Sequence, residues 1–406
     1  SVDVNLDRII LSANWMGACG VKGQDAALYD GVSAASSFCQ ELGVSIPVGK
    51  DSLSMKTSWK DQAGEDKTVV SPVSLVVSAA APVYDIRNNL LPMFAESVRD
   101  SSLLLIDLGH GKDRLGGSVY SQVTQRFDSV TPDMEDPKEL KKFLELIRSL
   151  SAKGAILAYH DRSDGGLAAA LCEMMFASHV GVEIVADALV SKDRTLNQAL
   201  FNEELGAVIQ VARGRAAEVE RDFEAAGMGW SLKYLGNLTQ DDHLNIYLEG
   251  KCVLSEDRVD LQKAWNEVSW QIARMRDNPE CADSEYELIS DKHNGGLVLT
   301  MGFDPEENLA APFINTGVRP KVAILREQGV NSQNEMASAF LQAGFDAVDV
   351  HMTDLLEGRA KLADFVGLAA CGGFSYGDVL GAGGGWAKTI LHNAKLQSSF
   401  RRFFET

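Results

Sequence analysis

The chain has 406 residues, enough for two or three domains, and its composition (45% hydrophobic, 23% charged, 7% aromatic) is that of a globular protein. Its 57 acidic and 38 basic residues give a net charge of −19, which argues against a nucleic acid or an anionic membrane as partner. No signal peptide or membrane-spanning run is visible, and the six scattered cysteines lack a C-x-x-C pair, so we expect a cytoplasmic protein without structural zinc or disulfides.

The first hundred residues have the pattern of an α+β unit. A strand is predicted over residues 7–14 and a helix over residues 25–42. Farther along, Lys50, Asp51 and Ser52 follow a short predicted strand and a glycine. These side chains are candidates for a polar rim around phosphates. A solvated turn is the alternative that we favour, because the phosphate-loop motif G-x-x-x-x-G-K-[ST] is absent.

The next segment begins with a near-continuous apolar run. Residues 103–108 (LLLIDL) predict a strand that is covered on both faces. The glycine-bearing loop after it is either a phosphate cradle or, as we favour, a simple turn, because no G-x-G-x-x-G is present. Residues 139–153 predict an amphipathic helix, and residues 243–255 predict a hairpin that turns at Glu249–Gly250.

The most informative stretch, AYHDRSDGGL, joins a predicted strand to a predicted helix. It supplies a carboxylate, a hydroxyl, a candidate N-cap and two glycines: Asp161, Ser163, Asp164, Gly165 and Gly166. A helix N-terminus leaves backbone N–H groups without partners and therefore favours an anion. One carboxylate beside phosphates is the usual way in which proteins hold Mg²⁺. The stretch predicts a Mg²⁺–nucleotide phosphate site, and an ordinary capped connection remains the open alternative.

Three further features of the sequence have a structural explanation that we favour over a functional one. The acidic pair Glu203 and Glu204 faces either a metal ion or, as we favour, solvent at a helix end. An apolar stripe that includes Trp265, on a helix predicted over residues 259–275, indicates packing rather than a ligand site. Residues 277–296 are polar and rich in helix breakers, so they predict a linker.

The tail predicts the start of an open, doubly wound α/β sheet. Three strands are expected, over residues 321–325, 347–350 and 365–370. Ser332 and Glu335 predict a capping box at the start of the helix between the first two strands. In such sheets ligands bind beyond the carboxyl ends of the strands, so the segment after the third strand is a candidate site.

That segment begins with Cys371, Gly372 and Gly373. A thiol beside glycines suggests a nucleophile, but no His–acid pair can be placed beside it and no G-x-C-x-G elbow is present. We therefore expect the thiol to be buried. The amide N–H groups of Gly372 and Gly373 are candidates for a loop that stabilises an oxyanion.

Seven stretches resemble the large formylglycinamide ribonucleotide amidotransferases (phosphoribosylformylglycinamidine synthases) of purine biosynthesis. In chain order they are LSANWM (11–16), PVGKDSLSMKT (47–57), AYHDRSDGGL (158–167), FNEELGAVIQV (201–211), RDNPECAD (276–283), RPKVAILREQGVNS (319–332) and ACGGFSYGDVLGAG (370–383). The stretches run through the whole chain in the order of that family, which makes the resemblance specific.

The resemblance implies α+β synthetase domains similar to aminoimidazole ribonucleotide synthetase, followed by the first half of an α/β class I glutamine amidotransferase domain. The expected parts are the end of an N-terminal-type synthetase domain, a C-terminal-type synthetase domain, a helix with a linker, and a truncated glutaminase domain, over residues 1–100, 101–255, 256–317 and 318–406. The family's glutaminase Cys, His and Glu are expected beyond Thr406. We therefore assign no catalytic residue here, and we expect this segment to be inactive without the remaining segments of the same polypeptide.

The family reaction uses ATP to phosphorylate the formyl amide oxygen of formylglycinamide ribonucleotide. Ammonia released from glutamine then displaces phosphate and gives the amidine. Carried over by position, Asp161 would bind Mg²⁺ and Ser163 would contact ATP or ADP, with Gly165 and Gly166 beside it. The family has one catalytic and one structural nucleotide site, and we expect these residues to belong to the structural one.

The resemblance also matches Gly372 and Gly373 to the loop that supplies the oxyanion hole of the glutaminase. Three interpretations of the function remain open. The segment is either part of the ligase or a non-catalytic nucleotide-binding scaffold that docks the glutaminase. An independent kinase-like phosphotransferase is a third alternative, and the missing phosphate-loop motif argues against it.

Overall fold

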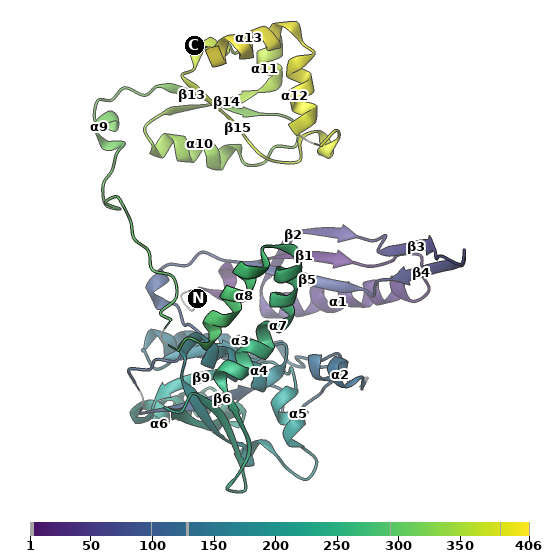
Figure 1. Cartoon of the computed structure of the whole chain (residues 1–406), viewed down its shortest axis with the longest axis vertical. Coiled ribbons are helices and arrows are strands. Elements are labelled where there is room, and N and C mark those ends of the chain that lie inside the picture. Colours follow the sequence, from purple (N-terminus) through teal and green to yellow (C-terminus); the bar gives the residue numbers. More distant parts are fainter. Residues whose placement is uncertain (1–3, 99, 127–129, 293, 382, 406) are drawn as a thin grey trace. The chain divides into compact units, whose positions relative to one another are not determined.

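The structure is a computed structural model that describes residues 4–98, 100–126, 130–292, 294–381 and 383–405. Contacts divide the chain into two compact units, Ser1–Asn294 and Gly295–Thr406 (Figure 1). Within the described residues, no helix is long and apolar enough to cross a membrane.

The first unit begins with a three-stranded sheet in the order β2-β1-β5. β1 (Ile10–Met16) pairs in parallel with β2 (Ser45–Ser52) and antiparallel with β5 (Ser74–Ala80). The predicted helix is confirmed as α1 (Gln24–Leu42), which connects the two parallel strands. It ends at Gly43, where φ is 83° and glycine avoids the steric cost of the left-handed region.

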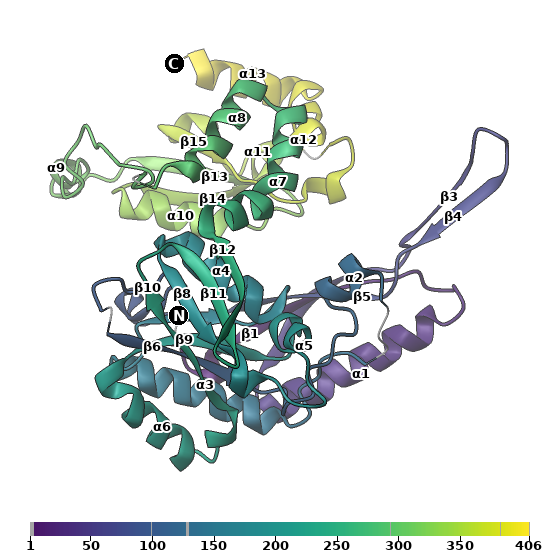
Figure 2. The ribbon, with the colours of Figure 1, turned by 60° about the horizontal axis from the view of Figure 1, so that its bottom comes forward.

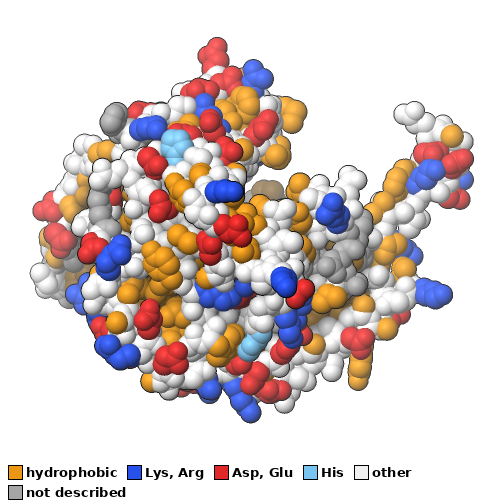
Figure 3. All heavy atoms as spheres, turned by 90° about the horizontal axis from the view of Figure 1, so that it is seen from below, with side chains coloured by type: hydrophobic (Ala, Val, Ile, Leu, Met, Phe, Trp, Pro, Cys, Tyr) orange, Lys and Arg blue, Asp and Glu red, His pale blue; other side chains and the backbone are white. Residues whose placement is uncertain are grey.

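A hairpin of β3 (Lys56–Lys60) and β4 (Asp66–Val70) is inserted between β2 and β5. Both ribbon views show it projecting beyond the three-stranded sheet (Figures 1 and 2). On the face drawn in Figure 3, basic and acidic side chains are interspersed with apolar ones instead of being separated by sign. The acidic excess of the chain is therefore not collected into one patch on that face.

A seven-stranded mixed sheet forms the rest of this unit's framework, in the order β12-β11-β8-β10-β6-β9-β7. Its strands are β6 (Ser101–Asp107), β7 (Ala158–Asp161), β8 (Gly181–Val185), β9 (Gly206–Ala212), β10 (Leu232–Thr239), β11 (His243–Leu248) and β12 (Lys251–Asp257). The helices between them are α2 (Val119–Thr124), α3 (Pro137–Ala152), α4 (Gly166–Ser178), α5 (Leu196–Phe201) and α6 (Ala216–Ala225). The predicted hairpin is confirmed as β11 and β12, with Glu249 and Gly250 both at positive φ.

The position of β6 between two hydrophobic clusters explains why its sequence is apolar at consecutive positions. Leu103 and Leu105 enter one core cluster, which they share with α4. Leu104 and Ile106 enter a second cluster, which contains side chains of α3 and α6. Successive strand residues point to opposite faces of a sheet, so helices on both faces require an apolar residue at every position. The prediction of a strand covered on both faces is confirmed.

The segment after the sheet differs from its prediction. α7 (Arg258–Arg276) is followed by α8 (Pro279–Glu287), a helix where a linker was expected. Asn278 caps α8 by accepting the N–H of Cys281 at 3.1 Å, and a proline in the first turn needs no donor there. The packing expectation for the α7 stripe holds in part for Trp265: its ring centroid lies 5.9 Å from that of Phe176 on α4, although 60% of the residue is exposed.

The second unit has a parallel three-stranded sheet in the order β14-β13-β15. Its elements are α9 (Ala311–Ile314), β13 (Lys321–Arg326), α10 (Gln333–Gln342), β14 (Asp346–His351), α11 (Met352–Glu357), β15 (Gly367–Ala370), α12 (Gly383–Leu391) and α13 (Ala394–Glu405). The predicted doubly wound α/β start is confirmed. The predicted capping box is wrong, because Ser332 makes no side-chain cap to α10 and donates instead to the carbonyl of Gly372 at 3.0 Å.

Candidate functional site

The AYHDRSDGGL stretch forms β7, a short loop and the start of α4. Asp161 is the last residue of β7 and is exposed, and its Oδ1 accepts the phenol of Tyr159 at 2.6 Å. Residues two apart in a strand share a face, so the strand itself sets this pairing. His160 points the other way, with Nε2 2.9 Å from Oε2 of Glu173 on α4. The candidate carboxylate is thus oriented by its own strand.

The single exposed carboxylate of Asp161 suits a metal ion whose other ligands are phosphate oxygens. The described residues contain no cluster of three or more His, Cys, Asp or Glu side chains able to bind a metal ion. Mg²⁺ commonly takes only one or two carboxylates and completes its octahedron with phosphate oxygens and water. Asp161 alone therefore fits a Mg²⁺–nucleotide site but does not build an all-protein cage. Its role as a metal ligand stays a prediction.

The start of α4 is organised differently from its prediction. The N-cap is Gly165 rather than Asp164, and it makes no side-chain cap. Gly165 has φ 80°, and its N–H donates to Oε1 of Glu203 at 2.9 Å. Ser163 is exposed, and its carbonyl accepts the N–H of Gly166 at 2.9 Å. A carboxylate already accepts the amide of the N-cap residue, and the Ser163 carbonyl accepts the amide of the first helical residue, so a phosphate would have to use other donors of the loop.

Gly166 is required by packing. Its φ is 70°, and a Cβ built on it would lie 2.6 Å from the carbonyl oxygen of Asn202 and 2.8 Å from that of Leu200. Contacts this short with backbone atoms leave no room for a side chain. The end of α5 therefore packs directly on the start of α4, and this packing alone explains the second glycine. A nucleotide contact by Gly165 or Gly166 stays a prediction.

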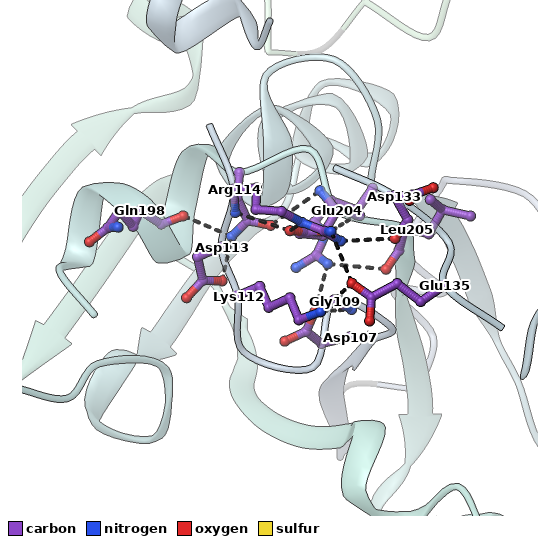
Figure 4. Close-up of polar contacts among 12 residues, drawn as sticks. Asp107, Gly109, Lys112, Asp113, Arg114, Asp133, Glu135, Gln198, Glu204 and Leu205 are labelled. Carbon is purple, nitrogen blue, oxygen red and sulfur yellow. Dashed lines mark hydrogen bonds and ion pairs between the residues drawn. The ribbon is translucent and has the colours of Figure 1, made fainter. Parts of the chain in front are cut away.

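The acidic pair beside this loop is not a solvated helix end, and that expectation is wrong. Glu204 is fully buried and accepts Nε of Arg114 at 2.7 Å and its backbone N–H at 3.0 Å (Figure 4). Glu203 accepts the N–H of Val119, at the start of α2, at 2.9 Å. Both carboxylates therefore hold loops and helix starts together, and neither lies in a metal-binding cluster of the described residues.

A buried ion network lies behind the loop, and the sequence did not indicate it. The guanidinium of Arg162 is fully buried and donates to Oδ1 of Asp107 at 2.7 Å, while Lys233 donates to Oδ2 at 2.8 Å. Burial alone would raise the pKa of Asp107, but the charges of Arg162 and Lys233 outweigh it and hold that pKa well below its usual range.

A second pair adjoins this network. Arg194 donates to Oδ1 of Asp113 at 2.6 Å, and Asn202 donates to the same oxygen at 2.9 Å. Burial raises the pKa of Asp113, and the charge of Arg194 opposes that rise. Figure 4 shows Asp107 and Asp113, from the end of β6 and the loop after it, in the same region as Glu204, from the segment before β9. The loop that follows Asp161 is thus anchored, through Arg162, by charges from elements far away in the sequence.

The predicted phosphate rim has a different local structure from the expected turn. Lys50, Asp51 and Ser52 lie inside β2, where they pair in register with Asn14, Trp15 and Met16 of β1. Among the described residues, no hydrogen bond or ion pair joins them to Asp161 or Ser163. Their contact with phosphate stays a prediction.

The predicted oxyanion loop follows β15. Cys371 is buried in the core, and burial raises the pKa of its thiol, as expected for a residue without a nucleophilic role. Gly373 has φ 151°, and a Cβ on it would lie 2.7 Å from the carbonyl oxygen of Gly329. Within the described residues, the amide N–H groups of Gly372 and Gly373 have no hydrogen-bond partner. Their role as oxyanion donors stays a prediction.

Three family models match consecutive parts of the chain. The FGAR-AT PurM_N-like domain matches residues 1–82, the C-terminal domain of AIR synthase related proteins matches residues 101–249, and the CobB/CobQ-like glutamine amidotransferase domain matches residues 319–406. FGAR-AT denotes formylglycinamide ribonucleotide amidotransferase, the family that the seven sequence stretches resemble.

Solved structures match parts of this chain at low similarity. T. maritima PurL complexed with ATP is 12% identical with a TM-score of 0.41, over 62% of this chain and 36% of that chain. PurLQS from Thermotoga maritima is 11% identical with a TM-score of 0.44, over 63% and 38%. E. coli HypE, a hydrogenase maturation protein, is 16% identical with a TM-score of 0.41, over 61% and 72%. These scores are too low to support a statement about function.

The matched part amounts to little more than a third of each of the two T. maritima chains. The family assignment rests on the domain models, whose order along the chain is also the order of the seven stretches. Together they show that the chain belongs to the formylglycinamide ribonucleotide amidotransferase family.

Proposed function

We propose that the chain is part of an ATP- and glutamine-dependent carbon–nitrogen ligase that converts formylglycinamide ribonucleotide to formylglycinamidine ribonucleotide. The observation that carries this proposal is the succession of a synthetase-type N-terminal domain, a synthetase-type C-terminal domain and a glutamine amidotransferase domain in one chain. A ligase of this kind needs both a nucleotide site and a source of ammonia, and these domain types supply them.

In this proposal Asp161 is the carboxylate that meets a Mg²⁺–nucleotide. The phenol of Tyr159 holds Oδ1, so the orientation of the carboxylate is set before a ligand arrives. Bound Mg²⁺ would neutralise phosphate charge and orient the phosphates. Ser163 offers an exposed hydroxyl two residues farther along. The proposed partners are small molecules (formylglycinamide ribonucleotide, ATP and glutamine-derived ammonia) together with the remaining segments of the polypeptide.

The second candidate function is a nucleotide-binding scaffold that stabilises the synthetase without taking part in turnover. The anchoring of the loop favours this candidate, because Arg162 ties it to Asp107 on β6 and to the carbonyl groups of Glu204 and Leu205. A loop held by so many buried contacts suits a rigid, permanently occupied site. The family resemblance includes such a structural site beside the catalytic one.

The complete amidotransferase chain carrying Asp161→Ala tests both candidates, with Asp164→Ala, an exposed carboxylate in the loop that follows, as the matched control. Ammonia replaces glutamine in the assay, so only the synthetase reaction is measured. Formation of ADP, the content of bound nucleotide and the melting temperature are recorded for each variant.

A collapse of ADP formation with unchanged melting temperature and retained protein-bound ADP supports a catalytic site at Asp161. Loss of bound ADP and a lower melting temperature, with turnover per folded enzyme retained, supports the scaffold. Unchanged nucleotide content and turnover in both variants would show that Asp161 is not a nucleotide ligand.

A further inference from the structure

A buried carboxylate lies at the carboxyl edge of the sheet in the second unit, outside every residue assigned so far. β13 is the central strand, and its neighbours β14 and β15 lie on opposite sides of it. All three run in parallel, so the segments that follow them meet at one edge. An edge at which the strand order reverses is where sheets of this type place their ligands. Glu327 is the first residue after β13 and is 7% exposed.

Two segments at this edge are joined through their backbones. The first is residues 327–332, after β13, and the second is residues 371–378, after β15, which contains the predicted oxyanion glycines. Four hydrogen bonds connect them or their strand ends: Cys371 N to Leu325 O (3.1 Å), Phe374 N to Gly329 O (3.0 Å), Tyr376 N to Gln328 O (3.0 Å) and Ser332 Oγ to Gly372 O (3.0 Å). The position of the glycines therefore depends on the first segment.

Glu327 ties this pair of segments to the rest of the sheet edge. Its Oε2 accepts the phenol of Tyr376 at 2.6 Å, and its Oε1 accepts the N–H of Gln328 at 2.9 Å. Nε2 of His351, at the end of β14, lies 3.4 Å from Oε1. Nδ1 of the same ring accepts the N–H of Thr353 at 3.2 Å, which leaves the ring proton on Nε2, toward the carboxylate. One buried carboxylate thus contacts the ends of all three strands or the segments after them.

The segment that Tyr376 belongs to is strained. Tyr376, Asp378 and Leu380 have φ of 55°, 61° and 59°, in the left-handed region that side chains other than glycine rarely adopt. Such conformations persist only where surrounding contacts determine them. Burial, and then the hydrogen bond to Glu327, raise the pKa of Tyr376, so the phenol stays protonated and continues to donate. The contact between Tyr376 and Glu327 is therefore the side-chain bond best placed to hold the segment.

We propose that Glu327 and Tyr376 form a clamp that fixes the backbone of Gly372 and Gly373 for glutamine cleavage. Both act as positioning residues through those glycines, whose N–H groups, unpaired within the described residues, would stabilise the oxyanion that forms on the side-chain amide oxygen of glutamine. The inference rests on the proposed function, because it requires the glycines to be the oxyanion donors. A sub-ångström displacement of such donors weakens catalysis without abolishing binding.

The test uses the complete amidotransferase chain with Tyr376→Phe, which removes one hydroxyl from a ring of the same shape, and Glu327→Gln. Asp349→Asn is the matched control, because it removes a carboxylate from β14 of the same sheet, where 55% of its side chain is exposed and its partner is Arg326 rather than Tyr376. Product formation is measured with glutamine and with ammonia. We expect kcat with glutamine to fall about 10- to 100-fold in the clamp variants, with KM for glutamine within about twofold and the ammonia rate unchanged.

Two outcomes overturn the clamp. One is kcat with glutamine within twofold of wild type in Tyr376→Phe. The other is an equal loss of the glutamine and ammonia rates, which indicates general destabilisation. Gly373→Ala tests the underlying assignment separately, because its Cβ must displace Gly329 and Val330. If Gly373→Ala loses glutamine cleavage while Tyr376→Phe does not, only the clamp is wrong; if neither does, the oxyanion assignment itself is wrong.

Discussion

Replacing Arg162 by Met tests whether the buried ion network holds the candidate loop. The guanidinium makes three hydrogen bonds in the interior, to Oδ1 of Asp107 (2.7 Å) and to the carbonyl oxygens of Glu204 (2.6 Å) and Leu205 (3.1 Å). Methionine keeps most of the volume but donates to none of them. Lys233 remains beside Asp107 at 2.8 Å and compensates part of the loss.

The expected cost follows from burial. Removing one partner of a buried ion pair typically costs about 3–5 kcal/mol, because the other charge is left without compensation. With Lys233 still in place, we expect a loss of about 4 kcal/mol in the free energy of unfolding of the first unit, or a fall in melting temperature of about 10 °C. The exposed pair of Lys153 and Asp222, at 2.6 Å, gives the contrast, since Lys153→Met should cost about 1 kcal/mol or less.

Urea and thermal unfolding, followed by circular dichroism, measure both variants. The pKa of Asp107 is lowered in the folded state, so its stabilisation is present above about pH 4 and is lost as the pH falls through the folded value. The loss in free energy of unfolding caused by Arg162→Met should therefore be largest near neutral pH and become smaller in acid. The reasoning is refuted if Arg162→Met loses no more stability than Lys153→Met, or if its deficit does not change with pH.

Two further predictions concern packing and thiol chemistry. Gly166→Ala should destabilise the first unit by about 1–3 kcal/mol more than Gly111→Ala, because both glycines have φ near 70° but only at Gly166 would a Cβ meet backbone atoms; equal losses in urea unfolding would contradict this. At pH 8, a thiol reagent should label the exposed Cys252 and Cys281 rapidly and Cys172 slowly, because burial raises the pKa of Cys172 to about 12 and leaves little thiolate. Mass spectrometry of peptides measures the labelling rate of each thiol. If Cys172 is labelled as fast as Cys252, this pKa argument is wrong.

Short sequence patterns, such as apolar runs and glycine stops, correctly predicted several strands, helices and turns. The apolar run of β6 predicted a strand covered on both faces, because helices pack against both of its sides. The α1 helix with its glycine stop and the turn at Glu249–Gly250 were predicted by short-range steric requirements. In each case the residue pattern on which the prediction rests is continuous in the sequence.

Three of the failures share one physical cause, since a partner far along the chain replaced the local one. Asp164 was expected to cap α4, but the N-cap is Gly165, and Glu203 on another segment accepts its N–H. Ser332 was expected to cap α10, but it bonds the loop 40 residues away. Glu204 was expected in solvent, but it is buried, because the guanidinium of Arg114, 90 residues away, compensates its charge.

The sequence by itself determined the two architectures, the family and the segments that carry Asp161, Ser163, Gly372 and Gly373, because these depend on apolar periodicity and on motifs that are continuous in the chain. Only the tertiary structure decided which polar groups pair. It placed Arg162 under the candidate nucleotide loop and Glu327 under the glycine loop, in both cases against side chains from other segments of the chain. Burial makes such pairs selective, because a charge in the interior must find its partner wherever the fold brings one within hydrogen-bonding distance.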